Sequence, residues 1–273
     1  MIAFEKYYFN IPGGYIYVNI DSKINKEYKN IIIFYFLLNK TDFKDESINV
    51  YVQYKNGIYN CYSPFYNAEV ESHKFERFLD KLNVWIIGLI NKILMKRKSN
   101  KNWFAIHGSA CHYNNKTILI VGQKTSGKTT LLKKFIEKGA SYISDDTIYL
   151  NDSITKVNPN TLCMRIKNSN EELSNQFFDK VKLDMVYTRP RKICKDITIP
   201  YYFIYLDKKH ICSPTIISNN NLVQIILKNL KFINMQNNNL ANFLSNCSKK
   251  LTCIKINAYF DEHVESLIKL LSA

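Results

Sequence analysis

Apolar residues gather in short runs over the first 70 residues of the chain. Three runs rich in β-branched and aromatic residues, at positions 15–20, 31–38 and 48–54, are separated by a Pro-Gly-Gly segment at 12–14 and by polar turns. Such runs between turn residues are typical of β-strands. The pattern predicts a small, β-rich N-terminal domain over residues 1–71.

The apolar period changes to that of a helix after Ser72, a suitable N-cap residue. Apolar side chains then recur on one stripe, which consists of Phe75, Phe78, Leu79, Leu82, Trp85, Ile86, Leu89, Ile90 and Ile93. The pattern predicts a connecting helix over residues 72–100, which leads into a third segment over residues 101–273.

Strand-like and helix-like patterns alternate from residue 103 onward. Two strand-like runs between positions 103 and 121 flank Asn114 and Asn115, a pair that favours a two-residue hairpin turn. A helix is expected over 128–138, with Gly139 at its C′ position, and then strands at 141–144 and 147–150. Beyond these, strands are expected near 162–166, 201–206 and 251–259, and helices near 171–181, 221–235, 240–248 and 262–271. The chain is therefore expected to be of the α/β class with α+β character.

The composition is that of a globular protein, with 46% hydrophobic and 22% charged residues. The apolar stretches at 31–38 and 85–94 are far shorter than the roughly 20 residues that cross a bilayer. The first eight residues carry charges where a signal peptide would be apolar. We therefore expect a cytoplasmic protein with no membrane partner. The seven cysteines are scattered and never spaced as C-x-x-C, so neither a disulfide framework nor a zinc site is predicted.

The formal charge of +15 suggests a nucleic-acid partner at first sight. However, the lysines are spread through a chain that is rich in Asn, Lys, Ile and Tyr, a joint bias expected of an AT-rich coding sequence. No nucleic-acid-binding motif accompanies them. Nucleic acid is thus a disfavoured partner, and a polyanionic ligand or an acidic peptide substrate suits the charge better.

Residues 122–129, GQKTSGKT, match G-x-x-x-x-G-K-[ST] at every fixed position. A strand-like run at 117–121 precedes this loop, and a helix-forming segment follows it. Glycines let backbone N–H groups wrap a phosphate, and the helix N-terminus adds partial positive charge. We expect Lys128 to bridge the β- and γ-phosphates and the Thr129 hydroxyl to bind Mg²⁺. The predicted nucleotide-binding residues are Gly122, Gln123, Lys124, Thr125, Ser126, Gly127, Lys128, Thr129 and Thr130.

Two acids, Asp145 and Asp146, follow the next predicted strand. If the strands at 117–121 and 141–144 belong to one right-handed βαβ unit, both end at the same sheet edge, and the acids emerge beside the phosphates. One carboxylate could then hold Mg²⁺, and the other could accept the proton of an attacking hydroxyl. Alternatively, the Ser-Asp-Asp segment only caps a turn. The sequence does not say which aspartate has which role.

The hairpin register predicts the position of His107. If the two asparagines form the turn, Tyr113 pairs with Lys116, and counting back sets His107 opposite Gly122. A histidine there would lie at the mouth of the phosphate site, although it could also be a surface or capping residue. His112 lies near the turn and has no predicted role.

The segment 106–150, IHGSACHYNNKTILIVGQKTSGKTTLLKKFIEKGASYISDDTIYL, resembles the HPr kinase/phosphorylase family. It is especially similar to the shorter HPr-kinase-like proteins found with peptide natural-product clusters, which include lasso-peptide precursor kinases. In that family a His-Gly dipeptide precedes a hairpin, and a P-loop, a short helix that ends in glycine and an Asp-Asp pair follow. Over the rest of the chain only the order of elements fits.

The resemblance implies a kinase core over residues 101–273, with a mixed central sheet flanked by helices. It implies Mg²⁺-dependent transfer of phosphate from ATP or another NTP to a serine-type hydroxyl of a peptide or protein, as in precursor-peptide tailoring. His107, Lys128, Asp145 and Asp146 fall on the family's catalytic positions, and Thr129 with the two aspartates on the metal-binding ones. A homo-oligomer is implied as well, because HPr-kinase relatives are often oligomers.

Three features depart from the family. Thr125 stands where glycine is common, and the R-G-x-G segment linked to dephosphorylation has no counterpart, which favours a kinase alone. The first 100 residues do not resemble the regulatory domain of the full-length enzymes.

Three other functions are alternatives. A transport ATPase of the ABC type would need a signature loop of the LSGGQ kind and a distant acid after a strand, and neither is recognised in the sequence. The presence of His107 and both aspartates disfavours an idle nucleotide-binding switch or scaffold. A kinase of a small-molecule alcohol stays open.

Basic residues after the two aspartates offer weaker candidates for a binding role. Arg189, Arg191 and Lys192 form a cluster that could contact nucleotide phosphates or an acidic acceptor, although a solvated loop is the expected role. Arg165 is a weaker candidate again.

Overall fold

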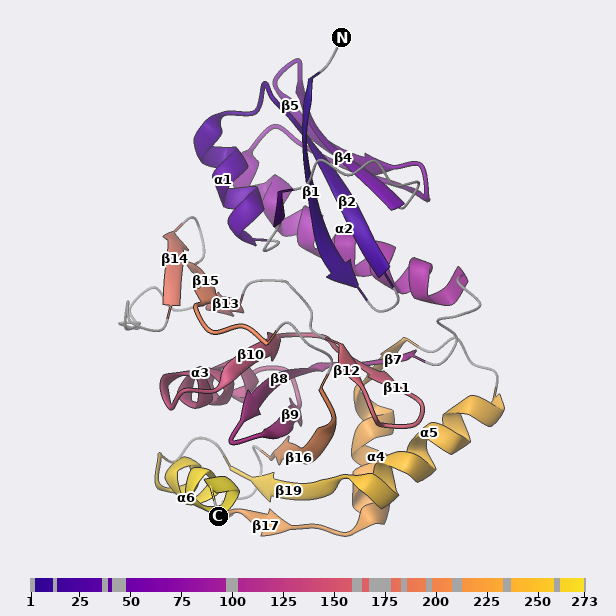
Figure 1. Ribbon diagram of the computed structural model, residues 1–273, viewed down its shortest axis with the longest axis vertical. Coiled ribbons are helices and arrows are strands. Elements are labelled where there is room, and N and C mark those ends of the chain that lie inside the picture. Colours follow the sequence, from indigo (N-terminus) through magenta and orange to yellow (C-terminus); the bar gives the residue numbers. More distant parts are fainter. Residues whose placement is uncertain are drawn as a thin grey trace. The chain divides into compact units, whose positions relative to one another are not determined.

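The computed structural model describes residues 3–11, 14–35, 39–40, 48–96, 103–158, 164–166, 178–182, 186–194, 198–207, 213–232, 237–257 and 261–272. The chain divides into two compact units, which are described separately. Unit 1 comprises Met1–Lys101, Thr161–Asn170 and Lys180–Arg189, and unit 2 comprises Asn102–Asn160, Glu171–Asp179 and Pro190–Ala273. Figure 1 labels their elements.

Within the described ranges, unit 1 is built on a six-stranded sheet of order β3-β1-β2-β4-β5-β6. The β2–β4 pair is parallel and the other neighbours are antiparallel. Burial alternates along β4 and β5, and α2 packs against β5 and β6. The elements are β1 (Phe4–Ile11), β2 (Gly14–Asp21), α1 (Lys26–Tyr35), β3 (Asn39–Lys40), β4 (Ile48–Lys55), β5 (Ile58–Ser63), β6 (Tyr66–Ser72) and α2 (Phe75–Lys96).

The apolar stripe predicted for α2 is confirmed, because each of its nine residues from Phe75 to Ile93 is buried. The predicted start at Ser72 is wrong by three residues. Ser72 ends β6, and its Oγ accepts a hydrogen bond from the Lys74 N–H at 3.3 Å. The helix begins at Phe75 after this local turn.

The strand predicted over 31–38 is wrong, because residues up to Tyr35 belong to helix α1. Asn25 caps this helix: its Oδ1 accepts the Glu27 N–H at 2.8 Å. On the helix, Ile31 and Ile32 are buried, and Tyr28 stacks on a phenylalanine of α2 with ring centroids 4.1 Å apart. Packing of one helical face thus overrides the β preference of the isoleucine run. Residues 36–38 lie outside the described residues.

Unit 2 contains two further sheets within the described residues, one of order β10-β8-β9-β16-β19-β17 and one of order β12-β11-β7-β18. The elements are β7 (Trp103–Ile106), β8 (Gly108–Tyr113), β9 (Lys116–Gly122), α3 (Lys128–Glu137), β10 (Ser141–Ser144), β11 (Ile148–Asn151), β12 (Val157–Asn158), β16 (Pro200–Leu206), β17 (Thr215–Ile216), α4 (Asn219–Asn229), β18 (Leu230–Phe232), α5 (Asn237–Lys250), β19 (Thr252–Ile256) and α6 (Asp261–Ser272). Three short strands, β13 (Met164–Ile166), β14 (Phe178–Lys182) and β15 (Val186–Pro190), form a separate sheet, and most of its residues belong to unit 1.

The larger sheet of unit 2 is mixed, as expected. Strands β9, β16 and β19 are parallel neighbours, whereas β8 pairs antiparallel with both β9 and β10. Helix α3 packs against β8 and β9, and α4 packs against β9 and α5. The predicted α/β class, with a mixed sheet flanked by helices, is confirmed (Figure 1).

The hairpin before the glycine loop forms in the predicted register. Asn114 and Asn115 have φ angles of 47° and 59°, both in the left-handed region that such a turn requires. Tyr113 pairs with Lys116. Gly139, with φ +93°, follows the C-cap of α3 as predicted. Because β10 and β9 are both antiparallel to β8, they run in the same direction, although β8 separates them.

Other expectations hold in part. The strands predicted near 201–206 and 251–259 and the helices near 240–248 and 262–271 correspond to β16, β19, α5 and α6. The helix predicted over 221–235 ends at Asn229, because the chain pairs with β7 as β18. The helix predicted over 171–181 is wrong at 178–181, where β14 pairs with β15, and 171–177 lie outside the described residues.

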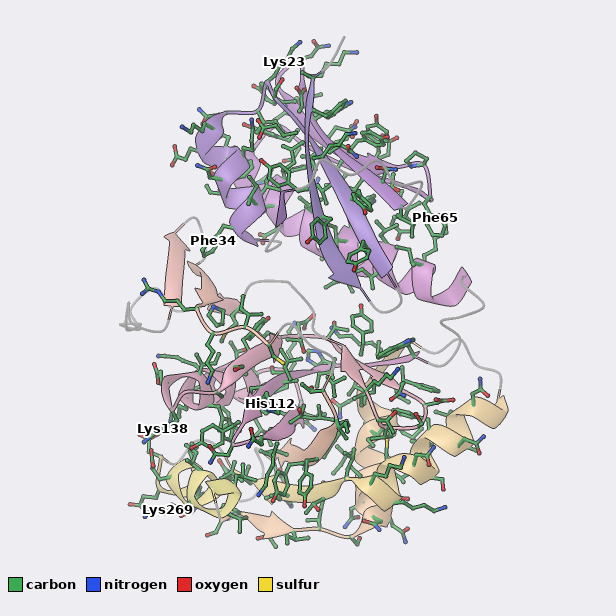
Figure 2. The ribbon with its side chains drawn as sticks, in the orientation of Figure 1. Lys23, Phe34, Phe65, His112, Lys138 and Lys269 are labelled. Carbon is green, nitrogen blue, oxygen red and sulfur yellow. The ribbon has the colours of Figure 1, made fainter. Side chains whose placement is uncertain are left out.

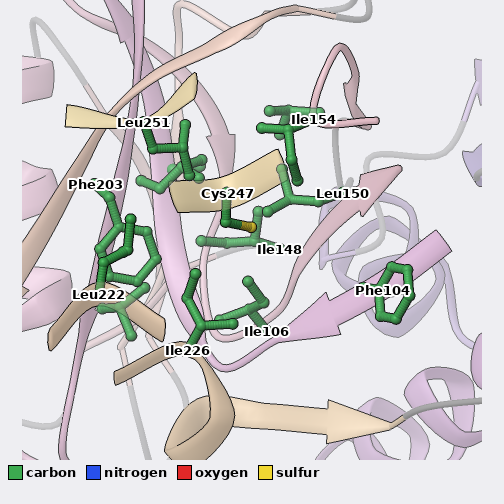
Figure 3. Close-up of a cluster of buried hydrophobic side chains, with 14 of the residues drawn as sticks. Phe104, Ile106, Ile148, Leu150, Ile154, Phe203, Leu222, Ile226, Cys247 and Leu251 are labelled. Carbon is green, nitrogen blue, oxygen red and sulfur yellow. The ribbon is translucent and has the colours of Figure 1, made fainter. Parts of the chain in front are cut away.

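The core of unit 2 joins side chains from both of its sheets and from α4 and α5 (Figure 3). Phe104 of β7 stacks on Phe243 of α5, with ring centroids 4.0 Å apart and planes 15° apart, and both rings are buried. Cys247 and Cys253 belong to the same cluster. The five cysteines that the structure describes are free thiols. None of the helices in the described part of the chain has the length and apolar composition that a membrane span requires.

Replacing Phe243 by Ala should reduce the free energy of unfolding of unit 2 by about 3–5 kcal/mol, because it removes the buried ring stack between β7 and α5. Urea unfolding followed by circular dichroism measures this loss. Leu227→Ala, at a position of α4 that is 46% exposed, should cost about 0.5 kcal/mol or less. Equal unfolding midpoints for the two variants would contradict the assigned core.

Candidate functional site

The predicted site residues gather where the chain crosses twice from one sheet of unit 2 to the other. His107 alone joins β7 to β8, and residues 145–147 join β10 to β11. Because β7 pairs with β11 and β8 pairs with β10, these two crossings lie side by side. The Gly108 N–H approaches the Asp146 carbonyl oxygen at 3.4 Å. Strand pairing therefore brings the histidine and the acids together.

The glycine loop starts where β9 ends, at Gly122, and α3 starts at Lys128. A Cβ atom on Gly122 would come within 2.6 Å of Ser126 Oγ and 2.9 Å of the Leu206 carbonyl oxygen, so no other residue fits. Gly127 has φ +91° and Thr125 has φ +62°. A non-glycine residue at such a φ costs about 1–2 kcal/mol. Thr125 thus holds a backbone shape that glycine adopts more easily.

Lys128 folds back over the loop. Its Nζ donates to the carbonyl oxygens of Gly122 and Gln123, both at 2.9 Å, and the residue is only 8% exposed. Ser126 Oγ is buried, and no hydrogen-bond partner is found for it among the described residues. Buried polar groups are rarely left without a partner, so this hydroxyl is available to a ligand. A bound phosphate suits this arrangement, because a lysine, two residues with left-handed backbone conformation and a buried hydroxyl lie at a helix N-terminus.

Asp145 lies beside the start of α3. Thr129 Oγ1 donates toward its carboxylate, 3.2 Å from Oδ1 and 3.1 Å from Oδ2, and Ser109 Oγ donates to Oδ1 at 2.5 Å. Burial raises the pKa of Asp145 above its usual range, and these two hydroxyl donors lower it by less. The predicted meeting of Thr129 with one aspartate is therefore present in the structure.

Asp146 faces different partners. His107 Nδ1 lies 3.0 Å from its carbonyl oxygen and 3.2 Å from its Oδ1, and Lys231 Nζ lies 2.6 Å from Oδ2. A carbonyl oxygen only accepts, so Nδ1 carries the ring proton. Burial raises the pKa of the Asp146 carboxyl, but the hydrogen bond from His107 and the charge of Lys231 outweigh it. The net pKa lies well below the usual range.

The residues at the start of α3 fit Mg²⁺ that arrives with a nucleotide. Mg²⁺ prefers oxygen ligands and is commonly bound by one or two carboxylates together with substrate phosphates. Thr129 and Asp145 offer hydroxyl and carboxylate oxygens at one point. Among the described residues, no group of three or more His, Cys, Asp and Glu side chains is arranged to hold a metal. One hydroxyl and one carboxylate leave coordination positions that phosphate oxygens could fill.

Sequence reasoning missed three residues of this region. Ser109 and Lys231 contact the two aspartates, and Lys231 comes from β18, which pairs with β7. Asp207 directly follows β16, whose Leu206 pairs with Gly122, so a distant acid after a strand is present and the expectation of its absence is wrong. The apolar run at 201–206 before an aspartate was a signal for it. Its Oδ2 forms an ion pair with Lys255 Nζ at 2.7 Å.

His112, which has no predicted role, and the weaker candidates Lys192 and Arg165 lie in other parts of the described structure. His112, labelled in Figure 2, lies on β8, and its Nδ1 is 3.1 Å from Thr117 Oγ1. Lys192 Nζ donates to the Gly139 carbonyl oxygen, beyond the C-terminal end of α3 and thus away from the glycine loop. Arg165 lies on β13, which pairs with β15 in the separate sheet.

Comparisons with known proteins give little more. No protein-family model matches the sequence, and no curated protein matches it significantly. Among solved structures, the chain matches the structure of the Hpr(Ser) kinase/phosphatase from Coxiella burnetii with 12% identity, over 61% of this chain and 94% of that chain. The TM-score is 0.33, and a likeness at this level carries no conclusion about fold or function.

Lys231→Met should raise the pKa of Asp146 toward the value of about 3.9 found in unfolded chains. A carboxyl whose pKa is lowered by folding stabilises the protein at pH values above its unfolded pKa. This contribution is lost as the pH falls through the folded pKa. The variant should therefore be less stable at pH 7 by about 0.2–1 kcal/mol, as for an exposed ion pair, with a smaller difference below about pH 4.

Urea unfolding and an NMR titration of ¹³C-labelled aspartate carboxyls measure these two effects. Lys249→Met, at an exposed position of α5, removes the same charge and should leave the pKa of Asp146 unchanged. An unchanged Asp146 titration in Lys231→Met would show that the ion pair does not set this pKa.

Proposed function

We propose that the chain is a kinase that transfers the γ-phosphate of ATP or another NTP to a serine-type hydroxyl of a peptide or protein. The observation that supports this most directly is the convergence of the Thr129 hydroxyl and the Asp145 carboxylate at the start of α3, beside the pair of His107 and Asp146. A module that only binds nucleotide has no need of the second pair. Tailoring of a precursor peptide remains the finer proposal and rests on the resemblance of segment 106–150.

The glycine loop and α3 would hold the phosphate chain. The N-terminus of α3 carries partial positive charge, and Lys128, already placed over the loop, would offset the charge that builds up on the transferred group. Mg²⁺ bound by Thr129 and Asp145 would neutralise part of the charge on the β- and γ-phosphates. Asp145 suits this role because its carboxylate accepts hydrogen bonds from two neutral hydroxyls, whereas the Asp146 carboxylate pairs with His107 and Lys231.

His107 and Asp146 would act on the acceptor. The sequence left the proton-accepting role to one of the aspartates, but Asp146 is a weakened base because His107 and Lys231 stabilise its ionised form. With the ring proton fixed on Nδ1 by Asp146, Nε2 is the nitrogen that can accept the proton of an attacking hydroxyl. We therefore assign the general base to His107 and the orientation of its ring to Asp146.

Lys128→Ala and Asp146→Asn should each reduce phosphotransfer by about 100-fold or more, because they remove charge stabilisation and ring orientation respectively. Transfer of labelled phosphate from ATP to serine peptides, compared with free serine and sugars, measures the activity and separates a peptide kinase from a kinase of small alcohols. Lys138→Ala, past the far end of α3, is the matched lysine control. Full activity in either site variant would overturn the assignment.

Thr129→Val should raise the Mg²⁺ concentration needed for half-maximal nucleotide binding by about tenfold or more, which corresponds to about 1.4 kcal/mol. Thr129→Ser keeps the hydroxyl and should behave like the parent chain. Fluorescent ATP binding, titrated with Mg²⁺ after removal of metal by EDTA, gives this comparison. An identical Mg²⁺ dependence in the valine variant would exclude the Thr129 hydroxyl as a metal-binding group.

A further inference from the structure

A cavity of about 620 Å³ opens beside the first half of the glycine loop. It is bounded by residues 122–124 of the loop, by His107, by one face of α4, and by Tyr205 and Lys255 of β16 and β19. The cavity contacts the loop before Lys128 and does not include the start of α3, where the phosphate chain is expected. It therefore lies on the histidine side of the loop, which is the acceptor side in the proposed reaction.

Helix α4 presents a polar face to this cavity. Asn221, Gln224 and Lys228 recur at intervals of three and four residues and line it, whereas Leu222 and Ile226 on the other face are buried in the core. The helix is tied to the site, because the His107 N–H donates to the carbonyl oxygen of its last residue at 2.8 Å. The polar face is thus held at the mouth of the glycine loop.

The charge of the cavity has one sign. Lys124 comes from the loop, Lys228 from α4 and Lys255 from β19, and none of the described residues that line the cavity is acidic. Lys255 also pairs with Asp207, which fixes its position and offsets part of its charge. Lys124 and Lys228 are exposed, so a ligand would contact them at the edge of the cavity. Ammonium and amide donors on a wall that has no acidic lining residue attract carboxylates.

We infer that this cavity binds an acidic segment of a peptide, with carboxylates at Lys228 and Lys124 and amide contacts from Asn221 and Gln224. The inference rests on the proposed function for its placement of the acceptor. The three lysines on the cavity wall come from three separate elements, which together give the wall its positive charge.

Fluorescence anisotropy at about 150 mM salt tests this inference. The probe is a labelled peptide in which a serine is flanked by Asp and Glu, and its control has Asn and Gln in their place. Both are titrated with the full chain, Mg²⁺ and a non-hydrolysable ATP analogue. Lys228→Gln should weaken binding of the acidic peptide about two- to fivefold, with unchanged affinity for the analogue. Lys249→Gln, exposed on α5 and absent from the cavity wall, removes the same charge and should have little effect.

Three results would overturn the inference. The acidic peptide could bind no better than the neutral one, the Lys249 variant could lose as much affinity as the Lys228 variant, or Lys228→Gln could weaken the ATP analogue instead of the peptide. Binding of the acidic peptide that depends on Lys228, without transfer of labelled phosphate from ATP, would support the cavity and contradict the kinase proposal. The two proposals therefore fail separately.

Discussion

The pairing of β7 with β11 and of β8 with β10 is the constraint on which the candidate site depends. It makes the chain cross from one sheet to the other at two neighbouring points, and a short irregular stretch of backbone joins the strands at each crossing. His107 occupies one passage and Asp145 and Asp146 the other. Strand β18 adds Lys231 because it pairs with the other edge of β7. Groups far apart in sequence are thus held together by sheet hydrogen bonds, without relying on a flexible loop.

The same passage gives two adjacent carboxylates opposite surroundings. Asp146 has φ 72°, a left-handed conformation that is uncommon outside glycine, asparagine and aspartate, and its carboxylate lies with His107 and Lys231. The carboxylate of Asp145 lies with two hydroxyls. The pKa values move apart accordingly, upward at Asp145 and downward at Asp146. Two acids whose environments differ in this way suit different tasks, which is why the proposal divides metal binding from orientation of the histidine.

Local patterns predicted the parts of the site that local chemistry determines. The glycine loop, the asparagine turn and the register that sets His107 near Gly122 depend on neighbouring residues, and these features are present. Ser109 and Lys231 were missed because only strand pairing brings them to the aspartates, and one lysine among many carries no local signal. The isoleucine run of α1 was misread because its helical state depends on packing against α2. Asp207 is a different case, because the apolar run before it is a local signal for an acid at the end of a strand.

The distribution of charge links the site to its proposed substrate. The carboxylates of Asp145, Asp146 and Asp207 each have hydrogen-bond or ion-pair partners within the protein, whereas the wall of the cavity carries lysines and no described acid. A phosphate chain at the start of α3 and a carboxylate-rich peptide at α4 would repel each other. Lys124 and Lys228 line the cavity and would offset part of that repulsion. In the proposed reaction, an acidic acceptor would approach the nucleotide along the wall that carries these two lysines.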